Sequence, residues 1–139
     1  MWLADGASAT TQGDEDPRPL LDSTVLDRLR AELDHDEGIW KIFVQDFVAQ
    51  LPGRIEKLRL SLTTGDPVGA MDAVLSLKTS SQMVGAERLA GLAVELERQL
   101  RVAHRDDGPA IVLPQVAAGH LTDLRRCAQQ TTFLLRRHL

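Results

Sequence analysis

The sequence is poor in aromatic residues, in cysteine and in long apolar runs, and each shortage excludes a class of protein. Aromatics make up 4% of the 139 residues and tyrosine is absent, although the apolar share is 43%. This composition disfavours a β-sandwich and favours an aliphatic helical core, because strands are enriched in aromatic and β-branched residues. Cys127 is the only cysteine, so no intrachain disulfide can form and we expect a reducing compartment.

No apolar run has the length of about 20 residues that a membrane-spanning helix requires. The N-terminal residues also lack the basic stretch followed by an apolar stretch that marks a signal peptide. The net charge is −4, of which −3 lies in the first 21 residues, so neither part has the basic character of a nucleic-acid-binding protein. We therefore expect a cytoplasmic protein that binds neither membranes nor nucleic acids.

The chain divides into a tail and one folded domain. Residues 1–20 mix Gly, Ser, Thr, acidic residues and two prolines without an apolar period, which predicts a flexible tail. Trp2 and Leu3 are the apolar exceptions, but an isolated terminal tryptophan is usually unordered. Residues 21–139 are sufficient for a single domain with its own core.

The first half of the domain predicts two helices. Asp22 and Ser23 are suited to cap the N-terminus of a short first helix. A long second helix carries an apolar stripe through residues 39–62. Pro52 lies inside it and should kink this helix, because the stripe continues in phase on both sides of the proline.

The second half predicts three more helices with brief connections. We expect them over residues 67–84 and 86–103, and from Pro114 to the C-terminus, with a polar loop at residues 104–109. Long amphipathic helices joined by short connections pack as antiparallel neighbours. The sequence therefore predicts an all-α fold, an antiparallel up-down four-helix bundle preceded by a short helix and the tail.

The helix over residues 67–84 has one narrow apolar stripe. At about 100° per residue, Leu75 lies roughly 140° from the centre of this stripe, so its side chain is expected to point largely to solvent. Met71, Lys78 and Gln82 share its flank, and Thr79 points fully outward. The stripe itself follows spacings of four, three, four and three residues and consists of Ala70, Val74, Leu77, Ser81 and Val84.

This helix and its continuation resemble the core motif of histidine phosphotransfer (HPt) domains. The family motif reads A-H-x-L-K-G-S-[SA], then G-A, then a leucine-rich helix that ends in L-E. Here the corresponding residues are the run Val74–Ser81, the pair Gly85–Ala86 and the pair Leu96–Glu97. HPt domains are four-helix bundles that pass a phosphoryl group between a histidine kinase and the receiver domains of response regulators. The resemblance covers roughly residues 26–101.

The resemblance implies that Leu75 occupies the position of the phosphorylated histidine. It also implies that Lys78 matches the lysine that stabilises phosphoryl charge and that Thr79 replaces a family glycine. Leucine has no lone pair and no titratable group, so phosphotransfer through position 75 is chemically excluded. We therefore predict no catalytic residue, no cofactor, no metal and no enzymatic activity.

What such a helix can keep is its docking surface. We predict a pseudo-phosphotransfer module that binds a response-regulator receiver domain or a histidine kinase without carrying phosphate. An apolar spot beside polar groups suits a modest protein–protein contact, and here it comprises Met71, Leu75, Lys78, Thr79 and Gln82. The opposing interpretation is that Leu75 is a surface residue without a role, since single exposed leucines are common.

Two other functions stay open. His120, at the edge of the apolar stripe of the last helix, is a candidate phospho-acceptor in place of position 75, although a histidine at such an edge more often serves ordinary packing. The bundle could also serve oligomerisation or ligand binding. The acidic turn Asp34–Glu37 lacks the spacing of a metal site. Cys127 is expected to be a buried, inert thiol.

Overall fold

The structure, a computed structural model, describes residues 16–105 and 108–139, and in this part of the chain it contains helices and no strands. The predicted tail at residues 1–15, with Trp2 and Leu3, lies outside the described residues. The helices are α2 (Ser23–Glu32), α3 (Glu37–Thr63), α4 (Pro67–Met83), α5 (Glu87–Arg105) and α6 (Pro109–Arg136).

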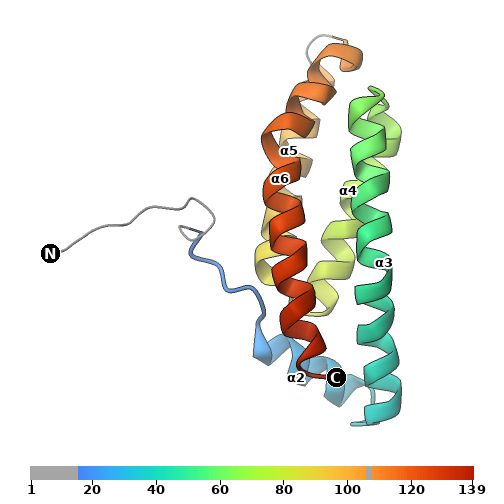
Figure 1. Ribbon diagram of the computed structural model, residues 1–139, viewed down its shortest axis with the longest axis vertical. Helices are drawn as coiled ribbons and strands as arrows, with labels where there is room; N and C mark the ends of the chain where they lie inside the picture. The colour runs from blue at the N-terminus through green and yellow to red at the C-terminus, as the bar shows by residue number, and fades with distance from the viewer. Residues whose placement is uncertain (1–15, 106–107) are drawn as a thin grey trace, which may run out of the picture.

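Helices α3 to α6 form the bundle, and α2 lies across the end where α3 begins and α6 ends (Figure 1). Each bundle helix packs against the next one in the chain, and α6 closes the ring against α3. Short connections force this up-down order, because each helix must turn back along its predecessor. The predicted four-helix bundle with a short preceding helix is therefore confirmed.

Aspartates cap the N-termini of three helices, and a glycine lies in the turn that follows each of two helices. The side chains of Asp22, Asp36 and Asp66 accept hydrogen bonds from backbone N–H groups in the first turns of α2, α3 and α4. Such caps satisfy donors that have no partner inside the helix. Gly65 and Gly85, which follow α3 and α4, have φ angles of 70° and 73°, a conformation that favours glycine. The boundaries predicted at Asp22, Asp66 and Gly85 are confirmed.

The prolines behave differently from the prediction at one place. Helix α3 continues through Pro52 as a single helix, as the uninterrupted apolar stripe indicated. Helix α6, however, begins at Pro109 and contains Pro114, so the predicted start at Pro114 is wrong. Gly108 offers no capping side chain, which removes the usual sequence signal. Pro109 takes the first helical position, where a proline costs no internal hydrogen bond, and Pro114 removes one bond inside the helix without ending it.

The core is aliphatic, as the composition indicated. All members of the predicted α4 stripe are fully buried, which confirms the angular assignment of that helix: Ala70, Val74, Leu77, Ser81 and Val84. Trp40 of α3 is also fully buried, and the guanidinium carbon of Arg30 in α2 lies 4.0 Å from the centre of its ring. This cation–π contact attaches α2 to the bundle.

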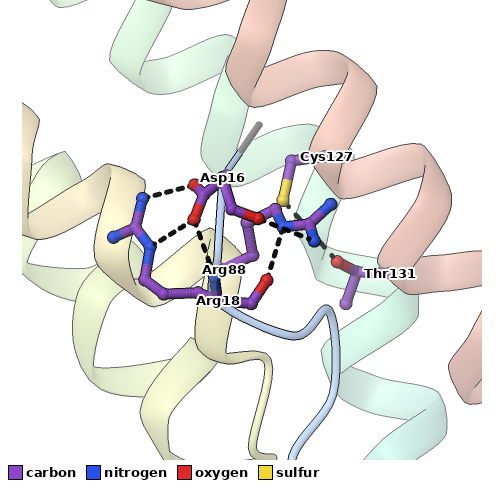
Figure 2. Close-up of polar contacts among 5 residues, drawn as sticks. All are labelled: Asp16, Arg18, Arg88, Cys127 and Thr131. Carbon is purple, nitrogen blue, oxygen red and sulfur yellow. Dashed lines mark hydrogen bonds and ion pairs between the residues drawn. The ribbon is translucent and has the colours of Figure 1, made fainter. Parts of the chain in front are cut away.

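Residues 16–21 form a segment, here called the N-terminal strap, that lies against the start of α5 (Figure 2). Arg88 of α5 holds it: Nε donates to the carbonyl of Arg18 at 2.8 Å, and the backbone N–H donates to the carbonyl of Pro19 at 3.0 Å. Leu20 and Leu21 pack against the core. The prediction of a flexible tail is therefore wrong for residues 16–20, because Arg88, which holds them, is distant in the sequence.

Candidate functional site

The candidate site is the outer face of α4, where the sequence placed its docking residues. Thr79 and Gln82 are exposed, whereas Met71, Leu75 and Lys78 are half-buried. Leu75 and Met71 pack against the core, so the prediction that Leu75 points largely to solvent is wrong in part. The physical reason is that α4 lies between α3 and α5, and α5 covers the flank that Leu75 shares with Lys78.

Lys78 is tied to α5 by an ion pair that the sequence interpretation did not foresee. Its Nζ donates to Glu97 Oε1 at 2.8 Å, and Glu97 Oε2 accepts from Arg101 at 2.6 Å. The hydrogen bond from Lys78, followed by the one from Arg101, holds the pKa of the Glu97 carboxyl below its ordinary value. Glu97 is therefore ionised at neutral pH, and it neutralises much of the charge of Lys78.

The chemistry available on this face is limited by its residue types. Helix α4 contains no histidine in its whole length, Pro67–Met83. At position 75 the side chain offers apolar surface alone, and beside it Lys78 and Glu97 form a compensated pair. A face of this kind can bind an apolar group, but it has no imidazole that could take up phosphate.

His120, the alternative phospho-acceptor, lies on α6 in a half-buried position. Helix α6 packs against α3 and α5 and has no comparable contact with α4. His120 therefore lies on the helix diagonally across the bundle from Leu75 and outside the α4 face.

Cys127 and the strap form a second polar cluster (Figure 2). The Cys127 thiol is buried, as predicted, and burial raises its pKa. Its sulfur lies 3.9 Å from the Thr131 hydroxyl. Within the strap, Asp16 accepts from the Arg18 guanidinium, and this bond lowers the pKa of the Asp16 carboxyl. The arrangement indicates that the hydrogen bonds of the strap have a structural role and that the thiol is unreactive.

Other kinds of site are scarce in the described residues. No group of three His, Cys, Asp or Glu side chains there is placed to hold a metal ion. None of the described helices has the combination of length and apolar character that crossing a membrane requires. A groove of about 550 Å³ lies between α3 and α6, lined among others by Leu51, Pro52 and Phe133. It opens at the surface, on helices other than α4.

Comparisons with known proteins agree with this geometry. Residues 42–131 match the family model of the Hpt domain. The chain is similar to the crystal structure of histidine-containing phosphotransfer protein B from Pseudomonas aeruginosa PAO1, with 25% identity, a TM-score of 0.69, and coverage of 86% of this chain and 94% of that one. It also has the fold of the HPT domain of a sensor hybrid histidine kinase from Shewanella, with 19% identity, a TM-score of 0.57, and coverage of 84% and 97%. No curated protein sequence gives a significant match.

Proposed function

Because the chain belongs to the Hpt domain family, whose members act in two-component phosphorelay signalling, we propose that it is a pseudo-phosphotransfer module. In this proposal it binds a receiver domain or a histidine kinase and carries no phosphate itself. The cytoplasmic location stays a prediction.

The observation that carries the proposal is the leucine at position 75. The resemblance of the surrounding motif supports assigning this position as the family's phospho-accepting one, and a leucine cannot attack phosphorus. The ion pair between Lys78 and Glu97 supports the same conclusion, because a lysine already paired at 2.8 Å has less charge to offer a phosphoryl group.

The surface proposed for docking combines apolar and polar groups. Met71 and Leu75 are half-buried and present the apolar part, while Thr79 and Gln82 are exposed beside them. The docking residues lie on one continuous helix. This suits a partner that inserts a helix or loop beside α4, since little order has to be created on binding. The expected contact is small and its affinity is micromolar.

Binding to receiver domains and kinases of the same organism tests the proposal, measured by pull-down and then by calorimetry. Leu75→Asp should weaken binding about tenfold or more, because it places a charge in the apolar centre. Thr79→Asp is the second variant, since Thr79 is exposed and its replacement does not disturb packing. Phe133→Asp is the matched control: Phe133 is 65% exposed but lies in the α3–α6 groove.

Incubation with a phosphorylated receiver separates the proposal from its alternative. The wild-type chain should acquire no acid-labile phosphate. A label that His120→Ala abolishes would replace the proposal with phosphotransfer through a displaced histidine. Absence of binding to every receiver and kinase at micromolar protein would refute docking, and self-association lost in Phe133→Asp would then favour a role in oligomerisation.

A further inference from the structure

A polar hollow lies beside the docking face, between α3 and α4, and is here called the α3–α4 notch. Its volume is about 370 Å³, and its polar lining comes from Gln50, Arg54, Lys57 and Ser76. The remaining lining residues are small, and a Cβ built on Gly53 would meet no atom within 4 Å. The notch is therefore an open hollow in which four side chains with hydrogen-bond donors stand beside apolar surface.

The two cations of the notch lack acidic partners. In the described part of the chain, no carboxylate oxygen lies within the 4.0 Å ion-pair distance of Arg54 or Lys57. Neighbouring cations differ: Arg59 Nη2 lies 2.6 Å from Glu56 and Lys78 Nζ lies 2.8 Å from Glu97. Arg54 is also half-buried, and a partly desolvated cation without a counter-charge favours an anion from outside.

The notch borders the docking face directly. Ser76 follows Leu75 in the sequence, so their side chains are about 100° apart on α4. Ser76 faces α3 and the notch, while Lys78 reaches α5. A partner that covers Leu75 would therefore have the notch at one edge of its contact and the Lys78–Glu97 pair at the other.

The charges around Leu75 are positive on balance although the whole chain has a net charge of −4. Two carboxylates, Asp72 on α4 and Glu97 on α5, stand against four cations on three helices. Glu97 is shared by two of these cations, which leaves one net positive charge on the α5 side, and the α3 side with Asp72 keeps another. The cations are Arg54, Lys57, Lys78 and Arg101.

We propose that the α3–α4 notch is an oxyanion-binding site and that it receives a carboxylate of the protein that docks on α4. Arg54 and Lys57 supply charge-assisted hydrogen bonds, with the Ser76 hydroxyl and the Gln50 amide as neutral donors. The assignment of the carboxylate to a docked partner rests on the proposed function, whereas the oxyanion site itself does not.

Inorganic phosphate is the probe for the site alone. Titration of ¹⁵N-labelled protein with phosphate at pH 7, against sodium chloride at equal ionic strength, should give saturable amide shifts at Gly53, Arg54 and Ser76. The double variant Arg54→Gln, Lys57→Gln should lose them. Arg98→Gln is the matched control, because Arg98 is an exposed cation on α5. Shifts that do not saturate, or that persist in the double variant, would overturn the site.

A bound receiver or kinase tests the carboxylate. The double variant should bind it about tenfold more weakly and with a flatter dependence on salt, because exposed ion pairs are screened. If binding is unchanged in the double variant, the carboxylate assignment is wrong while the proposed function stands. If no partner binds the wild-type chain, the proposed function fails, and the phosphate titration still decides whether the notch binds oxyanions.

Discussion

The turn after α4 gives the sharpest test of how the bundle end is built. Gly85 has a φ angle of 73°, and its carbonyl accepts from the backbone N–H of Asp22 at 2.8 Å. A Cβ at position 85 would lie 2.8 Å from the Asp22 carbonyl oxygen and 3.0 Å from Val25 Cβ. Gly85→Ala therefore combines a strained backbone with a collision against the start of α2.

The two costs can be estimated separately. The left-handed conformation costs an alanine about 1–2 kcal/mol, and overpacking against backbone adds about 1–2 kcal/mol. The free energy of unfolding should thus fall by about 2–4 kcal/mol, which lowers Tm by roughly 7–14 °C for a chain of this size. Gly119 is the matched control, because it lies inside α6 and a Cβ there meets nothing within 4 Å. Gly119→Ala should raise stability by about 1 kcal/mol.

Thermal and urea unfolding followed by far-UV circular dichroism measures both variants. Opposite signs are expected from the same chemical change, because helical backbone rewards alanine and the left-handed turn penalises it. A loss below about 1 kcal/mol in Gly85→Ala would refute the tight contact between the α4–α5 turn and α2.

Three further predictions concern the docking face and the strap. The double variant Leu75→His, Thr79→Gly should acquire an acid-labile phosphoryl group from a phosphorylated receiver, and the double variant Leu75→Asn, Thr79→Gly should not. Absence of phosphate on the histidine variant would show that the family geometry is lost. Arg88→Ala should loosen the strap, because it removes the side-chain hydrogen bonds to the carbonyls of Arg18 and Asp16; Cys127 should then react several-fold faster with a thiol reagent, and an unchanged rate would show that the strap does not protect the thiol. The folded state lowers the pKa of Glu97, so the ionised carboxylate stabilises the fold at pH values above the ordinary glutamate pKa, and this stabilisation is lost as the pH falls through the lowered pKa of the folded state. Glu97→Gln should therefore lose less Tm on acidification than the wild type. Curves of Tm against pH that run parallel for the two proteins would contradict the ion pair.

Local signals predicted most of the fold. The α4 stripe, the caps at Asp22 and Asp66 and the glycine after α4 each depend on residues a few positions apart, so sequence alone was sufficient. The start of α6 was misplaced because proline favours the first helical position, and both Pro109 and Pro114 offer that signal. The strap could not be predicted, since Arg88 holds residues 70 or more positions earlier.

The candidate site was predictable in its residues but not in its contacts. A helical wheel places Leu75 by angle from its own helix, and it contains no information about how closely α5 approaches. The partner of Lys78 is 19 positions away on α5, and the two cations of the notch belong to α3. Periodicity alone predicts where each of these residues lies on α4. The burial of Leu75 and the pairing of Lys78 can be known only from the packed bundle.

In the proposed function Leu75 stands at the family's phospho-acceptor position, and its half-burial bears on how this leucine should be understood. A phospho-accepting imidazole must stay accessible to an incoming receiver, whereas a leucine at the same place gains stability by lying against its neighbours. Lys78 follows the same logic, because it gains a partner in Glu97 at the cost of charge that a phosphoryl group could use. Both differences exchange reactivity for a fixed, partly apolar surface. Arg54 and Lys57, which have no ion-pair partner among the described residues, lie instead in the notch, one flank away. That separation favours a face that orients a protein partner over one that stabilises a phosphoryl group in transfer.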